Sequence, residues 1–173
     1  MIAAMIQWAA NGAILDDARC YRYRLWRTLD THSTRTMAVI GVNPSTANEA
    51  DDDATIRRCR RFALDSGHGR LEMINVFGWR DRDVTGLAAA ADPEGPDNWP
   101  TVMDVASKAD TVVCAWGAVA KLPPRLRHRP AEMARALRGR GIALSALAVT
   151  LSGDPAHPLY LPARNRPFLW EGP

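Results

Sequence analysis

Apolar residues along this chain gather in short continuous runs that alternate with segments of helical periodicity. Four such runs are typical of strands covered on both faces: 36–42, 71–79, 111–117 and 142–149. Three segments carry helical patterns: 51–67, 99–110 and 130–141. The alternation predicts an α/β protein, a three-layer α/β/α sandwich around a central, mostly parallel four-stranded sheet.

The segments outside this alternation predict an edge strand and loops. Residues 18–30 alternate large apolar with basic side chains, which predicts an amphipathic, half-exposed strand. The apolar opening, 1–17, lacks a basic start and is too short to span a bilayer. We expect it to form an N-terminal edge strand, hairpin or cap, and we expect a cytoplasmic protein without membrane contact. Residues 80–98 predict a long loop holding one turn of helix, and 150–173 show no periodicity. One domain, 1–173, is expected.

The composition is that of an ordinary globular protein, with 47% hydrophobic and 24% charged residues. A formal net charge of +3 permits a nucleic-acid partner without requiring one. Cys20, Cys59 and Cys114 lie far apart and show no CxxC spacing, which predicts free thiols rather than disulfides or a zinc site. The chain also lacks GxGxxG, P-loop and GxSxG motifs, so dinucleotide, nucleoside-triphosphate and esterase sites have no support.

Polar residues follow each of the four apolar runs. Ligands of parallel sheets bind at the carboxyl ends of the strands, so we expect these residues to share one edge. The segments in question are Gly41-Val42-Asn43-Pro44-Ser45-Thr46, Asn75-Val76-Phe77-Gly78-Trp79-Arg80, Trp116-Gly117 and Gly153-Asp154-Pro155-Ala156-His157-Pro158.

Three of these residues are candidates for chemistry. Pro44 favours an extended backbone at Asn43 and would hold its amide rigidly, although a turn or capping role is the commoner one for an asparagine at such a place. Asn75 lies inside an apolar run, where an unpaired amide costs about 1–3 kcal/mol. It suits the edge of an amide-like ring, or else a bond to a neighbouring backbone group. His157 lies in a loop stiffened by prolines, which is a good place to hold a ring.

The charged residues allow several interpretations. Capping and helix-dipole pairing account for the run 51–53 better than a metal site does, so we expect no metal. A basic cluster follows, and it fits a solvated helix face and a phosphate contact equally well: Arg57, Arg58, Arg60 and Arg61. His68 and His128 occupy turn-like contexts and are predicted surface residues.

Taken in order, these segments resemble the uracil-DNA glycosylase superfamily. That superfamily has a "GxDP" or "GxNP" motif after a strand, an asparagine-bearing strand, a strand ending in "WG" and a last loop beginning "HP". The matching residues are Gly41-Val42-Asn43-Pro44, Asn75-Val76, Trp116-Gly117 and His157-Pro158. The asparagine in the first motif is similar to the mismatch-specific branch. The segments "NPSTA", "DDDATIRRC", "NVFGWR", "AWG" and "HPLYL" together resemble the bacterial family DUF1643 still more closely.

The resemblance implies an enzyme that hydrolyses the N-glycosidic bond of uracil or another modified or deaminated base. Asn43 would orient the attacking water and His157 would donate a hydrogen bond to the departing base. The implied base-binding residues are Gly41, Val42, Pro44, Ser45, Asn75 and Phe77, with Phe62, Phe77 and Trp79 as alternative stacking rings. The implied DNA contacts are Thr46, Arg57, Arg58, Arg80, Pro158, Leu159 and Tyr160.

The same resemblance implies a partner and the absence of a cofactor. The partner is single- or double-stranded DNA carrying a modified base, which must be flipped out of a duplex to enter such a pocket. Three cysteines do not match the four that hold an iron–sulfur cluster in some branches, so we expect no cofactor. Two alternatives stay open: hydrolysis of a free modified nucleoside or nucleotide, and a non-catalytic base-binding module. We expect a monomer.

Overall fold

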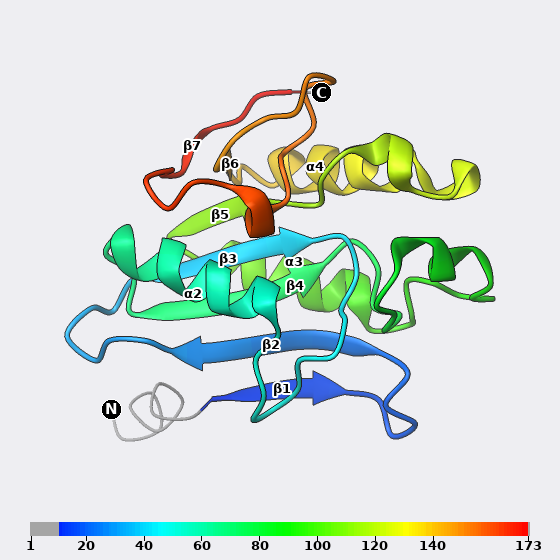
Figure 1. The fold of residues 1–173 in the computed structure, drawn as a ribbon, viewed down its shortest axis with the longest axis horizontal. Helices are drawn as coiled ribbons and strands as arrows, with labels where there is room; N and C mark the ends of the chain where they lie inside the picture. Colours follow the sequence, from blue (N-terminus) through cyan, green and yellow to red (C-terminus); the bar gives the residue numbers. More distant parts are fainter. Residues whose placement is uncertain (1–10, 173) are drawn as a thin grey trace.

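The computed structural model describes residues 11–172, which form a mixed α/β fold around one sheet (Figure 1). The strands are β1 (Gly12–Leu15), β2 (Arg22–Thr28), β3 (Thr36–Gly41), β4 (Arg70–Asn75), β5 (Thr111–Cys114), β6 (Leu144–Ala146) and β7 (Phe168–Leu169). The α-helices are α2 (Ala54–Asp65), α3 (Asn98–Lys108) and α4 (Arg129–Gly139). Short 3₁₀ turns lie at Val84–Ala88, Val119–Lys121, Pro124–Leu126 and Pro158–Tyr160.

The centre of the sheet is parallel and its edges are antiparallel. Within the described residues, the strand order is β1-β2-β4-β3-β5-β6-β7. The four apolar runs form β3 to β6, and the neighbours in the order β4-β3-β5-β6 pair in parallel. Strands β1, β2 and β7 pair antiparallel. The predicted α/β class is confirmed. The hairpin β1-β2 extends one edge, where an N-terminal edge strand or hairpin was predicted, and β7 extends the other edge, where no strand was predicted.

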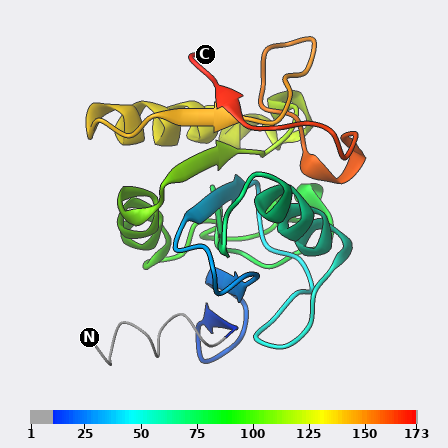
Figure 2. The same ribbon diagram turned by 90° about the vertical axis from the view of Figure 1, so that its left-hand side faces the viewer.

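Helices cover both faces of this sheet (Figure 2). Helix α2 packs Ile56, Cys59 and Phe62, at helical spacing, against side chains of β3 and β4 on one face. Helices α3 and α4 pack against the opposite face, where Val102 and Met133 are buried among strand residues. The carboxyl ends of the parallel strands therefore emerge between the start of α2 and the loops that leave β4 and β5.

The acidic run before α2 caps the helix, as predicted, and also forms ion pairs that were not predicted. The Asp53 carboxylate accepts a 2.8 Å hydrogen bond from the backbone N–H of Ile56 and caps the helix. The Asp52 carboxylate pairs with Arg27 at 2.8 Å and with Arg60 at 2.6 Å. These contacts fix the first turn of α2 against β2.

Two predictions about exposure were wrong. Strand β2 was expected to be half-exposed, but Arg22 and Arg27 are only 2% and 1% exposed, because residues 43–53 fold over them. His68 was expected at the surface but is 2% exposed, and its Nε2 lies 2.9 Å from Thr111 Oγ1. The segment before β3 covers the turn that carries His68. The two pack so closely that a Cβ added at Gly69 would lie 1.9 Å from the Ser33 carbonyl oxygen.

The chain ends differ from the sequence expectation in part. The predicted N-terminal strand or cap at 1–17 includes β1, and residues 1–10 lie outside the described residues. The aperiodic segment 150–173 contains β7, which is two residues long and below what periodicity detects. Among the helices described, none has the length and apolarity needed to cross a membrane.

Candidate functional site

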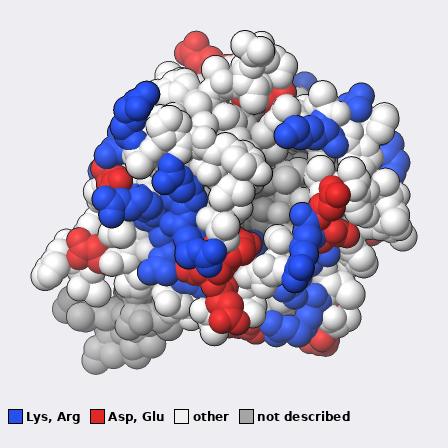
Figure 3. All heavy atoms as spheres, viewed as in Figure 1, with Lys and Arg blue, Asp and Glu red and all other residues white. Residues whose placement is uncertain are grey.

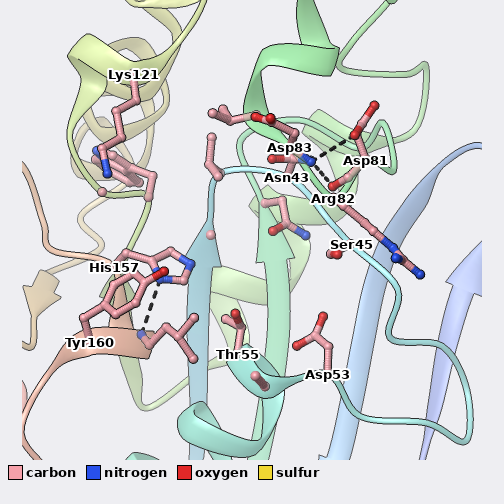
Figure 4. A pocket seen from close by; sticks show the side chains of 18 of the residues that line it. Asn43, Ser45, Asp53, Thr55, Asp81, Arg82, Asp83, Lys121, His157 and Tyr160 are labelled. Atoms are coloured by element: carbon pink, nitrogen blue, oxygen red, sulfur yellow. Dashed lines mark hydrogen bonds between the residues drawn. The ribbon is translucent and has the colours of Figure 1, made fainter.

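A pocket of about 730 Å³ opens at the carboxyl ends of the parallel strands. Its floor is formed where β3 and β4 end, and its walls come from the first turn of α2, the segment after β5 and residues 156–161 (Figure 4). Eight of the predicted site residues line it: Gly41, Val42, Asn43, Ser45, Asn75, His157, Leu159 and Tyr160. The spatial expectation for the three polar candidates therefore holds, while their chemical roles stay predictions.

Asn43 is fixed by the segment that follows β4. Its Nδ2 donates to the Asp81 carbonyl at 2.9 Å and to the Pro44 carbonyl at 3.3 Å. The Asp81 backbone N–H in turn donates to the Pro44 carbonyl at 2.9 Å, which ties the two loops together. Because Nδ2 is engaged, Oδ1 is the amide atom of Asn43 that remains to accept a hydrogen bond.

Asn75 ends β4 and is 2% exposed, yet it belongs to the pocket wall. Its Nδ2 is buried and has no hydrogen-bond partner among the described residues. The Asn75 carbonyl accepts a 3.1 Å bond from Asn98 Nδ2, which also donates to the Val76 carbonyl at 3.0 Å. The backbone is thus held by Asn98, while the Asn75 amide itself stays available to a ligand.

His157 presents a neutral imidazole to the pocket. The Leu159 backbone N–H donates to Nδ1 at 3.3 Å, which places the ring proton on Nε2 (Figure 4). Burial, and then the charge of Lys121, lower the pKa of His157, while Asp53 raises it. The net lowering keeps the ring uncharged near neutral pH, with Nε2–H as a donor.

Several pocket residues were missed or given another role by the sequence interpretation. Asp53 was predicted only as a helix cap, but its carboxylate also faces the cavity beside Thr55 (Figure 4). Other residues in this class include Arg22, Thr55, Asp81, Arg82, Asp83, Trp116 and Lys121. Trp116 was visible as the end of an apolar run. Lys121, in a short 3₁₀ turn, left no sequence signal.

The aromatic candidates for stacking do not line the pocket. Phe77 and Phe62 are buried in the two cores on opposite faces of the sheet. Trp79 packs edge-on against Tyr21, with ring centroids 5.4 Å apart. The aromatic rings that do line the pocket belong to Trp116, which is buried, and to Tyr160, which is 82% exposed at the rim.

The remaining predicted contacts lie outside the pocket and hold loops in place. Arg58 donates to the Leu161 carbonyl and so ties α2 to the segment that carries His157. Arg80 donates to the carbonyls of Ser45, Thr46 and Arg19 at 3.3, 3.5 and 3.0 Å. Pro44 and Pro158 are buried, whereas Thr46 and Arg57 are exposed.

The charge around the pocket is mixed. Figure 3 shows a hollow near the middle of the face that Figure 1 presents, with both basic and acidic side chains on its rim. The cations that line it are Arg22, Arg82 and Lys121, and the carboxylates are Asp53, Asp81 and Asp83. Across residues 11–172, no group of three or more His, Cys, Asp or Glu side chains is arranged to hold a metal ion.

Comparison with known proteins gives one match. A family model described as "Protein of unknown function (DUF1643)" matches residues 22–159, a range that contains all the pocket-lining residues except Tyr160 and Leu161. No curated protein and no solved structure matches the chain.

Proposed function

The chain belongs to the DUF1643 family, and we propose that its pocket binds a nucleobase and that it hydrolyses the N-glycosidic bond of uracil or another modified or deaminated base. One observation carries this proposal. Asn43, Asn75 and His157, from three segments far apart in sequence, line a single cavity of about 730 Å³. The order of the motifs that resemble the uracil-DNA glycosylase superfamily supports the same function.

The departing base is the first requirement of this reaction. It leaves with the bonding electron pair, so negative charge grows on a base oxygen. A donor aimed at that oxygen stabilises the transition state more than the ground state. His157 suits this role because its Nδ1 accepts the Leu159 N–H and its Nε2 carries the proton. A neutral donor also avoids transferring a proton to the base before the bond breaks.

The attacking water is the second requirement. Asn43 can orient it through Oδ1, since its Nδ2 is bonded to the Asp81 carbonyl. An amide cannot take the proton that the water releases, so a carboxylate in the same cavity must do so. Asp53 meets this need because one of its oxygens caps α2 while the carboxylate still faces the pocket (Figure 4).

Recognition of the base is the third requirement. Rotation of the Asn75 amide presents either a donor or an acceptor to the edge of a heterocycle, and its unpaired Nδ2 gains a partner when the base enters. Trp116 offers a ring in the wall. Tyr160, on the exposed rim, can fill the gap that a flipped base leaves in a duplex.

DNA with a damaged base is the first substrate class, and a free modified nucleoside or nucleotide is the second. The second is favoured by the charged groups inside the pocket, because a small ligand reaches them more easily than a polymer does. The DNA candidate predicts binding that weakens steeply with salt.

A base-release screen tests the proposal. The substrates are single- and double-stranded oligonucleotides and free nucleotides that carry uracil, hypoxanthine, xanthine or 5-substituted pyrimidines. Asn43→Ala and His157→Ala should abolish release without loss of folding. His128→Ala is the matched control, since His128 lies on the surface beside Glu132. No release from any substrate, or full release by either pocket variant, would overturn the proposal.

A further inference from the structure

Arg22 is a buried arginine that the proposed reaction does not use. It begins β2, lines the pocket and is 2% exposed. We propose that Arg22 forms an oxyanion subsite inside the pocket, and that the natural ligand carries a terminal phosphate or carboxylate that binds there. The identity of the rest of the ligand as a nucleobase rests on the proposed function.

The hydrogen bonding of Arg22 is incomplete. Within the described residues its side chain makes one hydrogen bond, from Nη1 to the Ala47 carbonyl at 2.8 Å. Its Nε is buried and has no partner. A guanidinium has five N–H donors, so most of the capacity of this buried group is unused.

Arg27 provides an internal comparison on the same strand. It is 1% exposed, and its guanidinium pairs with the Asp52 carboxylate at 2.8 Å. It also donates to the backbone carbonyls of four residues: Gly12, Trp26, Asn48 and Asp51. On this strand, therefore, the hydrogen-bonding capacity of Arg27, which holds loops, is used, whereas that of Arg22, where the pocket begins, is largely unused.

Electrostatics point the same way. Burial lowers the pKa of Arg22 to about 10, and the nearby charge of Asp53 raises it. Arg22 stays protonated at neutral pH, yet no carboxylate of the described residues lies within 4.0 Å of its nitrogens. A buried cation without a partner is unfavourable, and an anion that enters the pocket would supply the missing charge.

The neighbouring groups suit an oxyanion. The hydroxyls of Ser45 and Thr55 face the cavity, and Thr55 lies in the first turn of the 12-residue α2 (Figure 4). Backbone N–H groups at a helix start favour negative charge. Arg82 and Lys121 also line the cavity and form no ion pair in the part of the chain that is described. The negative charge of the Asp53 carboxylate repels an anion, so an anion in the pocket must bind close to Arg22 and away from Asp53.

The position of Arg22 restricts the ligand. A phosphate inside a DNA chain continues on both sides, so it stays at the rim when a flipped base enters. Only a terminal group can be enclosed with the base. A nucleoside monophosphate meets this condition, and a base with a carboxylate substituent is the other source of the same chemistry.

Calorimetric binding tests the subsite without requiring turnover. The probes are inorganic phosphate, deoxyuridine, deoxyuridine 5′-monophosphate, uracil and 5-carboxyuracil. The wild-type protein should bind the monophosphate about 10- to 100-fold more tightly than the nucleoside, the range expected for charge-assisted hydrogen bonds. A corresponding preference for 5-carboxyuracil over uracil instead would identify the carboxylate as the source.

The variants separate the subsite from general charge effects. Arg22→Gln should remove the preference for the anionic probe and Arg22→Lys should keep part of it. Arg140→Gln, which removes an exposed arginine just after α4, should leave the preference unchanged. If Arg22→Gln does not fold, the subsite is still tested by comparing the affinities of the wild-type protein for the neutral and anionic probes, and by the preference that Arg22→Lys retains.

The outcomes distinguish this inference from the proposed function. Equal binding of the neutral and anionic forms, with no binding of phosphate, would overturn the subsite while leaving a base pocket in place. Binding of phosphate without any binding of uracil or deoxyuridine would support the subsite and contradict the nucleobase assignment. An equal loss of the preference in Arg140→Gln would also overturn the role of Arg22.

Discussion

Replacing Asn75 by alanine should make the protein more stable while destroying its ability to bind a base. Asn75 is 2% exposed, and its Nδ2 has no hydrogen-bond partner among the described residues. A side chain with a purely structural role would be expected to have one. In the proposed base pocket the ligand supplies the partner of this Nδ2, so the free protein carries a cost that alanine removes.

The magnitude follows from that unpaired group. A buried donor without a partner costs about 1–3 kcal/mol. Truncation to alanine also removes contacts, but the vacated volume joins a cavity of about 730 Å³ rather than forming a new closed void. We expect a net gain of about 1 kcal/mol, which corresponds to a rise in melting temperature of about 2–4 °C for a chain of this length.

Urea denaturation gives the free energy of unfolding, and calorimetry with uracil gives the binding. Asn98→Ala is the matched control, because this neighbouring buried amide donates to the carbonyls of Asn75 and Val76. Its loss removes these two hydrogen bonds together with the unpaired Oδ1 of Asn98, and we expect a net cost of about 1 kcal/mol. The two asparagine-to-alanine variants should therefore shift stability in opposite directions.

A decrease of more than about 1 kcal/mol in the free energy of unfolding of Asn75→Ala would contradict this prediction. Such a loss would mean that the Asn75 amide supports the fold, and the physical basis for its role at the base edge would disappear. Unchanged affinity for uracil in a stabilised variant would contradict the assignment equally.

Three further predictions concern the same pocket. Asp53→Asn should keep the free energy of unfolding within about 0.5 kcal/mol, because asparagine caps helices as well as aspartate does, while the rate of base release falls about 100-fold. Unchanged release in a turnover assay would show that Asp53 is not the proton acceptor. Gly41→Ala places a Cβ 2.7 Å from Asn75 Oδ1 and would displace that amide, so the affinity for uracil should drop about tenfold. When Asn75 is already alanine, Gly41→Ala should cause no further drop, and additive losses would show that Gly41 acts independently of Asn75. Burial and the charge of Lys121 lower the pKa of His157, so the rate of base release should be constant above pH 6.5 and should fall when acid protonates the ring. Lys121→Ala should move that fall to higher pH. A rate that rises on acidification would contradict the role of His157 as a neutral donor.

The parallel centre of the sheet was predictable because strands buried on both faces leave continuous apolar runs. Such runs mark β3 to β6, and the polar residues that follow them do converge at one edge. Asn43 and His157 could be selected because each directly precedes a proline, which restricts the backbone of the residue before it. The rule that ligands bind at strand carboxyl ends then placed them together.

The burial of Arg22 was not predictable from local pattern. A period of two assigns basic residues to the solvent, but residues 43–53 fold back so that the Ala47 carbonyl covers Arg22. Phe77 was misplaced for a related reason. Strand β4 ends at Asn75, and the alternation of side chains stops there, so the Phe77 ring enters the core beside α3. Long-range packing determined both outcomes.

Titration of the labelled protein with free uracil and with hypoxanthine, followed by NMR, tests whether Asn43, Asn75 and His157 form one base-binding pocket. One of these bases should shift the side-chain amide signals of Asn43 and Asn75 and the imidazole signals of His157 together, with one dissociation constant, while the signals of His128 stay unchanged. Absence of any shift at saturating concentrations, or shifts confined to residues outside the pocket, would contradict it.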